Sequence, residues 1–151
     1  MSVSMKLEGL KELERKLGPI QAGKYWKALL QAAASDVKDY IAVYPAESIA
    51  NSPQARTWYE RGFGPRWYRK DGSVGGDKTS ETLGRRWTIS ANSERSIVGN
   101  NASYARAVQS AEEQPPFHAR RGWRTDEETI DKMRPKVVEK MRRAIDKILG
   151  R

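Results

Sequence analysis

The sequence contains no cysteine and only one histidine, His118, among its 151 residues. Disulfide bonds, thiolate metal sites and a cysteine nucleophile are therefore excluded. No Asp or Glu lies three or four residues from His118, so a metal site built around it is not expected. The neighbouring Arg120, Arg121 and Arg124 should lower the proton affinity of this imidazole. We expect neither a metal nor a cofactor.

Long apolar runs are also absent. No stretch approaches the ~20 apolar residues that cross a bilayer. The N-terminal sequence MSVSMKLEGLKELERKL alternates charge with leucine and has no apolar core of signal-peptide length. We therefore expect a soluble protein that is not exported and that has no membrane partner.

Catalytic motifs are missing as well. The segment Gly75–Thr79 resembles a phosphate-binding loop, but Asp77 replaces the glycine required before Lys78 and would repel phosphate. There is no G-x-S-x-G nucleophile elbow. The carboxylates Glu112-Glu113 and Asp126-Glu127-Glu128 are explained by a loop and a helix cap. We expect no enzymatic activity, and a hydrolase or toxin that uses the one histidine is the weakest alternative.

Charge dominates what the sequence does contain. The 28 Lys and Arg outnumber the 19 Asp and Glu, which gives a net charge of +9; charged residues make up 31% and hydrophobic residues 38% of the chain. This length fits one domain, residues 1–151, with a small core that neighbouring subunits could complete. The charge indicates attraction to a polyanion such as nucleic acid, although only His118–Arg124 is densely basic.

The N-terminal part of the chain has helical periodicity. Leucines at spacings of three and four over Met5–Leu17 predict a short amphipathic helix that joins the core or docks a partner. Gly18-Pro19 should end it. A second apolar stripe predicts a longer helix over Ala22–Tyr44, which Pro45 terminates.

The C-terminal part predicts a further long helix. Thr125 and Glu128 form a capping box before an apolar stripe that extends to Ile148. Pro135 lies within this stripe and predicts either a kink or the start of a second helix.

Aromatic residues are concentrated in a predicted hairpin. Arg56–Arg61 and Pro65–Lys70 have strand-like alternation on either side of Gly62-Phe63-Gly64. Aromatic rings that alternate with arginine can stack on bases while the arginines bind phosphates. They can equally pack across the strands beneath the arginine stems. The residues predicted to contact another subunit or DNA are Trp58, Tyr59, Trp67, Tyr68, Arg69, Lys78, Arg120 and Arg121.

A second hairpin is predicted from Arg85–Ala91 and Glu94–Gly99, which flank a turn at Asn92-Ser93. Between the hairpins, residues 71–81 are rich in glycine and should form a flexible loop. Ala102–Val108 is expected to be a strand end or a short helical turn.

Three short blocks between Thr82 and Phe117 resemble a known family. The blocks read TLGRRW, SYARAVQ and PPF. In this order they resemble the HK97 gp10-like tail-completion or neck proteins, which are minor tail components of long-tailed bacteriophages. The glycine of the first block is displaced to Gly84, and Gln109–Glu112 replaces an acidic-aromatic-glycine sequence. The matching positions are Thr82, Leu83, Arg85, Arg86, Tyr104, Ala105, Val108, Pro116 and Phe117.

The resemblance implies an α+β domain in which a curved antiparallel sheet packs against N-terminal helices and a long C-terminal helix. It implies a structural protein of a phage or prophage virion, located at the head–tail joint or tail end and made in the bacterial cytoplasm. Its partners would be copies of itself, in a ring that forms either in the isolated protein or only on assembly. They would also include other head–tail connector and tail proteins, and packaged DNA in transient contact.

A ring requires heterologous contacts, in which one surface of a subunit meets a different surface of the next. The candidates are the aromatic-arginine strands on one side and the loop Asp71–Ser80 on the other. The alternative function, suggested by the charge, is a small basic nucleic-acid-binding domain that uses the same aromatic residues.

Overall fold

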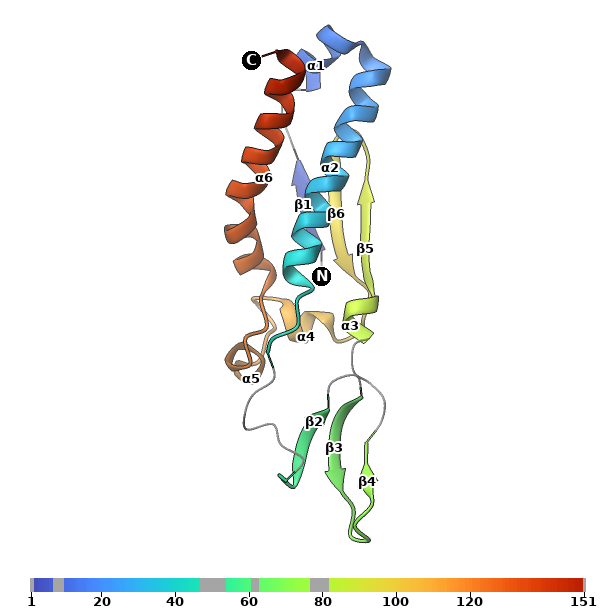
Figure 1. Ribbon diagram of the computed structural model, residues 1–151, viewed down its shortest axis with the longest axis vertical. Helices are drawn as coiled ribbons and strands as arrows, with labels where there is room; N and C mark the ends of the chain where they lie inside the picture. The colour runs from blue at the N-terminus through green and yellow to red at the C-terminus, as the bar shows by residue number, and fades with distance from the viewer. Residues whose placement is uncertain (1, 7–9, 47–53, 61–62, 77–81, 151) are drawn as a thin grey trace.

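The computed structural model describes residues 2–6, 10–46, 54–60, 63–76 and 82–150. These residues form an elongated molecule with three successive parts along its long axis (Figure 1). A helix-covered sheet, here called the main body, is followed by a layer of short helices, the base. A second, smaller sheet, the distal sheet, lies beyond the base.

The sheet of the main body has the strand order β1-β6-β5 and is antiparallel throughout. Its strands are β1 (Ser2–Lys6), β5 (Trp87–Ala91) and β6 (Arg95–Asn100). Val98 in the central strand lies opposite Val3 on one side and Ile89 on the other. Every second residue of β6 is buried, as is typical of an antiparallel sheet that is covered on one face.

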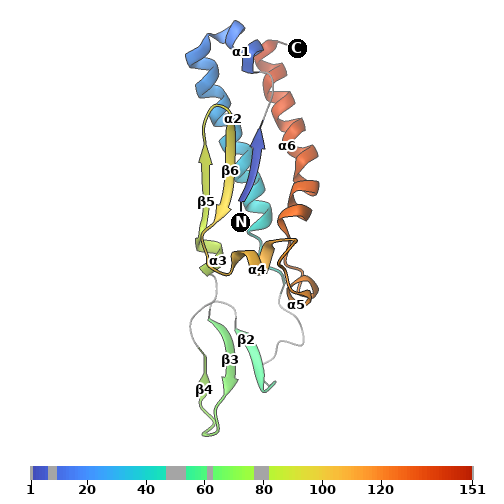
Figure 2. The same cartoon turned by 180° about the vertical axis from the view of Figure 1, so that it is seen from behind.

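Helices α1 (Leu10–Leu17), α2 (Pro19–Ile41) and α6 (Asp126–Leu149) belong to the main body. The two long helices cover one face of the sheet, and the view from behind shows no helix on the other face (Figure 2). Gly18, with a φ of 81°, makes the turn from α1 into α2. Pro19 then takes the first helical position, where a missing N–H has no cost.

The core of the main body lies between the long helices and the central strand. Burying each large apolar side chain contributes about 1.5–3 kcal/mol, so this core accounts for most of the cohesion of the main body. Its buried members are Trp26, Leu30, Ala33, Ala34, Val37, Val98, Met133, Val137 and Met141.

The base consists of α3 (Thr82–Arg85), α4 (Ala105–Gln109) and α5 (Pro116–Arg120). Two side chains connect it to the carbonyl end of α2. Gln109 Nε2 donates to the Ile41 carbonyl at 2.7 Å, and the Arg124 guanidinium donates to the Tyr40 carbonyl. These bonds pair carbonyls that the end of a helix otherwise leaves without partners.

The distal sheet has the order β2-β3-β4 and is also antiparallel. Its strands are β2 (Thr57–Glu60), β3 (Gly64–Tyr68) and β4 (Val74–Gly75). Both views show it beyond the base, with no helix over either face (Figures 1 and 2).

The predicted α+β class is confirmed, with antiparallel strands, N-terminal helices and a long C-terminal helix. The strands are divided between two sheets. The predicted curvature, and the assignment of residues 1–151 to one domain, stay predictions. Both predicted hairpins are present, and Ala102–Val108 resolves into the start of a short helix.

The predicted helix over Met5–Leu17 is wrong at its beginning. Met5 and Lys6 belong to β1, and the helix begins only at Leu10. Pairing with β6, which lies far along the sequence, overrides the local leucine periodicity. The next helix runs from Pro19 to Ile41, so it starts and ends earlier than expected.

Three further expectations need correction. The described part of the predicted loop 71–81 contains β4, and residues 77–81 lie outside the described residues. The strand predicted to begin at Arg85 begins only at Trp87, because Arg85 is the last residue of the short helix α3. Pro135 lies inside one continuous helix, so no second helix starts there. β4 and α3 are too short to give a periodic signal, and an exposed proline can be accommodated within an amphipathic helix.

Candidate interaction surface

One face of the distal sheet carries a pair of aromatic rings. The rings of Trp58 on β2 and Tyr68 on β3 lie 5.0 Å apart at an angle of 43°. This cross-strand contact agrees with the packing interpretation of the aromatic residues. Tyr68 nevertheless remains 46% exposed, so the pair leaves apolar surface open to a partner.

The opposite face carries Trp67. Its indole lies against Gly75 in the neighbouring strand, where an added Cβ would approach the indole Nε1 to 2.6 Å. Glycine at this position therefore allows the ring to contact β4 closely. Trp67 is still 42% exposed. Both faces of the distal sheet thus present aromatic surface.

Polar contacts hold the turn between β3 and β4. Arg69 donates to Ser73 Oγ and to the Val74 carbonyl, each at 3.3 Å. The Asp71 carboxylate accepts hydrogen bonds from the Ser73 hydroxyl and backbone N–H, which hold the pKa of Asp71 below its ordinary value. The described start of the predicted flexible loop is therefore a hydrogen-bonded turn.

Arginine also stacks on aromatic rings in this part of the molecule. The Arg66 guanidinium lies 3.6 Å from the Phe63 ring centroid and 2.7 Å from a Glu60 carboxylate oxygen. Such stacking presents a cationic plane beside an aromatic one, an arrangement that suits contacts with nucleic acids and with protein partners.

The base carries a second arginine-aromatic group, on α5. The Phe117 ring is 46% exposed and lies 4.1 Å from the His118 ring, while the Arg121 guanidinium lies 5.8 Å from the Phe117 centroid. Partial burial, and then the positive charge of Arg121, lower the pKa of His118. The expected direction is confirmed, although burial is the larger cause. Arg124 points elsewhere and stacks on Tyr40.

The blocks that carry the family resemblance converge on the base. Leu83, Ala105 and Val108 form one buried cluster, against which Tyr44 and Trp123 pack. Its polar contacts include Gly84 N donating to the Tyr44 hydroxyl at 3.0 Å and Asn100 Nδ2 donating to the Leu83 carbonyl at 2.8 Å. Thr82 is half-buried, and the remaining block positions, Arg85, Arg86, Tyr104, Pro116 and Phe117, are exposed.

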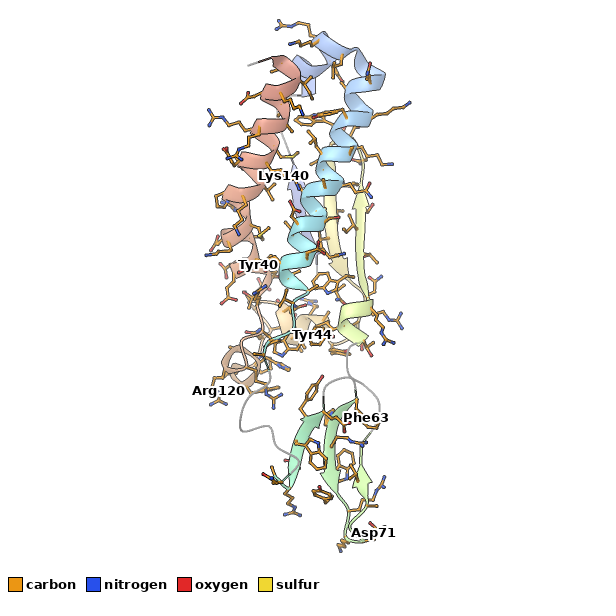
Figure 3. The ribbon with its side chains drawn as sticks, viewed as in Figure 1. Tyr40, Tyr44, Phe63, Asp71, Arg120 and Lys140 are labelled. Atoms are coloured by element: carbon orange, nitrogen blue, oxygen red, sulfur yellow. The ribbon has the colours of Figure 1, made fainter. Side chains whose placement is uncertain are left out.

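The predicted contact residues fall on two separate surfaces. Trp58, Tyr59, Trp67, Tyr68 and Arg69 lie on or next to the distal sheet. Arg120 and Arg121 lie at the end of α5 in the base (Figure 3). Lys78 lies outside the described residues.

Sequence reasoning missed a row of basic residues on α6. They recur at intervals of four, four, three and four residues, which places them on one side of a helix. The spacing was the available signal, but acidic residues interrupt the row along the sequence. The members are Lys132, Lys136, Lys140, Arg143 and Lys147.

The described residues contain no group of three or more His, Asp or Glu side chains that could hold a metal ion. Within the same ranges, no helix is long and apolar enough to span a bilayer.

Comparison with known proteins gives no relative from which a function could be transferred. No protein-family model matches the chain, and neither a curated protein sequence nor a solved structure is significantly similar to it.

Proposed function

We propose that this chain is a structural component of a phage or prophage virion, at the head–tail joint or the tail end, and that it acts by assembling into a ring. The observation that carries the proposal is the distal sheet, because no helix among the described residues covers either of its two aromatic faces. On this proposal the chain has no enzymatic role, and its other partners are head–tail connector and tail proteins.

An uncovered sheet of three short strands has little stability of its own in water. Exposed aromatic residues on both faces increase the free-energy gain from contact with another protein. A neighbouring subunit would supply the apolar cover that the described residues of the same chain do not. Two of the three family-like blocks pack together in the buried cluster of Leu83, Ala105 and Val108, which is consistent with this proposal.

The aromatic strands are β2 and β3, and the described part of the segment Asp71–Ser80 contains β4. β2 and β4 form the two edges of the distal sheet, with β3 between them. We propose that the β2 side of one subunit contacts the β4 side of the next. Such a contact joins two different surfaces, as ring closure requires.

The first test is light scattering across protein and salt concentration, together with negative-stain imaging. The double variant Trp67→Ser/Tyr68→Ser should abolish rings. A matched control is Val138→Ser, which removes an exposed apolar side chain from α6, where Val138 is 55% exposed. Rings that persist in the double variant, or after deletion of residues 72–79, would count against the distal sheet as the contact surface.

The second candidate function is a small basic nucleic-acid-binding domain. The arginine-aromatic groups around Phe63 and Phe117 favour it, because each places a guanidinium beside an aromatic ring. Tight, salt-sensitive binding of short DNA by the monomer, lost in Trp58→Ala/Tyr68→Ala, would support this function. Rings with weak DNA affinity would reject it.

A further inference from the structure

The basic row on α6 forms a continuous exposed stripe. Lys132, Lys136, Lys140, Arg143 and Lys147 are all exposed. From the first to the last, the stripe extends over about 22 Å at 1.5 Å of rise per residue. We call these five residues the α6 stripe.

One member of the stripe, Lys140, lies beside α2. Lys140 Nζ lies 2.5 Å from Asp36 Oδ2 on α2, and Figure 3 places Lys140 between the two helices. Arg143 Nε lies 2.7 Å from Glu139 on its own helix. Lys132, Lys136 and Lys147 form no ion pair with a described residue, so no described acidic side chain neutralises these three positive charges.

Acidic residues are concentrated in the first turn of α6, and basic residues predominate in the rest of the helix. Its first turn contains Asp126, Glu127 and Glu128, which stabilise the helix N-terminus. From Lys132 to Leu149 there are two acidic residues, Glu139 and Asp146, and seven basic ones. The seven basic residues are Lys132, Arg134, Lys136, Lys140, Arg142, Arg143 and Lys147.

We infer that the α6 stripe binds the phosphate backbone of duplex nucleic acid. A straight row of cations complements a rod that carries one negative charge per roughly 1.7 Å of its axis. The residues from Lys132 to Leu149 include no aromatic side chain that could stack on a base, and lysine ammonium groups recognise phosphate as point charges. The binding is therefore independent of base sequence.

This site differs from both surfaces discussed above. It lies on the main body and uses neither the distal sheet nor the arginines of α5. It also does not depend on ring formation, because all five cations belong to one helix of one chain.

The test compares two variants that remove equal charge. The stripe variant is Lys132→Gln/Lys136→Gln/Lys147→Gln, and the control is Arg69→Gln/Lys70→Gln/Arg120→Gln on the distal turn and α5. Fluorescence anisotropy with a labelled duplex of about 20 base pairs, from about 50 to 200 mM salt, gives the slope of log K against log salt. The stripe variant should reduce the slope by about 3 and the control by less than about 1.

An equal reduction of the salt slope in the two variants would overturn the inference, because it would show that the nucleic acid responds to the net charge of the protein alone. If only the control variant loses DNA affinity, the nucleic acid binds at the distal sheet or α5, and the inference is wrong. No binding by the unmodified protein at low salt would also reject the site. The variant Lys132→Arg/Lys136→Arg/Lys147→Arg should retain binding, and circular dichroism checks the folding of each protein.

Light scattering on the same samples separates this inference from the ring proposal. The stripe variant should retain the assembly state of the unmodified protein while losing DNA affinity. If its assembly is lost instead, the stripe is a subunit contact and the inference is wrong. If DNA binding follows the stripe but no ring forms, the ring proposal fails alone.

Discussion

The main-body sheet and the distal sheet have the same number and direction of strands but different surroundings. Each has three antiparallel strands. Val98, in the centre of the main-body sheet, is 1% exposed beneath the long helices, whereas Trp67 in the centre of the distal sheet is 42% exposed. The number of strands therefore does not decide whether a sheet is self-sufficient. A covering layer does, and within the described residues only one of the two sheets has it.

The two sheets also depend on different interactions. The main body buries a set of large apolar side chains, each contributing about 1.5–3 kcal/mol. The distal sheet has the ring pair Trp58–Tyr68, and such pairs contribute about 0.5–1.5 kcal/mol beyond the area that they bury. We therefore expect the distal sheet to open locally while the main body remains folded.

The largest expected effect tests this contrast directly. Trp26→Ala should lower the free energy of unfolding by about 3–5 kcal/mol, because it leaves a cavity at a fully buried position. Trp67→Ala should cost less than about 1 kcal/mol in the unassembled protein. Urea denaturation followed by far-ultraviolet circular dichroism measures both. Similar costs would show that the distal sheet is part of the same cooperative core.

A smaller effect should be confined to the distal sheet. Gly76 has a φ of 134°, and an added Cβ would lie 2.4 Å from the Pro65 carbonyl oxygen, so Gly76→Ala should destabilise β3–β4 pairing by about 1–3 kcal/mol. Hydrogen exchange of Trp67 and Tyr68 should accelerate while that of Val98 is unchanged. Gly72→Ala is the control. Its φ of 81° also strains an alanine, but no atom obstructs the new Cβ, so it should cost less than Gly76→Ala. Acceleration at Val98 would contradict independent opening.

The converse effect should be confined to the main body. The Thr125 hydroxyl accepts the Glu128 N–H at 3.2 Å, so Thr125→Ala should cost about 0.5–2 kcal/mol by removing the cap of α6. Glu128→Gln retains an acceptor for the Thr125 N–H and should cost less. Thermal unfolding measures the loss, and hydrogen exchange should show the distal sheet unchanged.

The smallest effect concerns pH and the base between the two sheets. Folding lowers the pKa of His118 from its ordinary value of about 6.5. At a pH just below that value, the folded state therefore binds fewer protons than the unfolded state. Stability should therefore fall as pH drops through this value. His118→Gln should remove part of that fall, as seen in unfolding midpoints at several pH values. A steeper fall in the variant would reverse the expected sign.

Local patterns predicted the elements whose contacts are local. The hairpins around Gly62–Gly64 and Asn92-Ser93 join neighbouring segments, and the Thr125–Glu128 capping box and apolar stripe of α6 are visible in one window of sequence. β1 was missed because its partner is β6, about ninety residues later. Short elements such as β4 and α5 contain too few residues for a periodic signal.

Only part of the candidate site could be predicted, because a local sequence pattern does not show which distant residues come together in the fold. Strand alternation identified the aromatic residues of the distal sheet, but no local pattern could separate Arg69 from Arg120, which lie on different parts of the molecule. Along the sequence, His118–Arg124 is the segment in which basic residues are densest. The α6 stripe is dispersed along the sequence and becomes continuous only when the helix brings its members together.

The pairing of β1 with β6 has a consequence for how the protein is made. During synthesis β1 precedes its partner strand β6, and α1, α2 and β5 are made between them. Contacts between such distant residues slow folding, since a long loop must close before they form. The growing chain therefore carries β1 without its partner until β6 has been made, and an unpaired strand of this kind promotes aggregation.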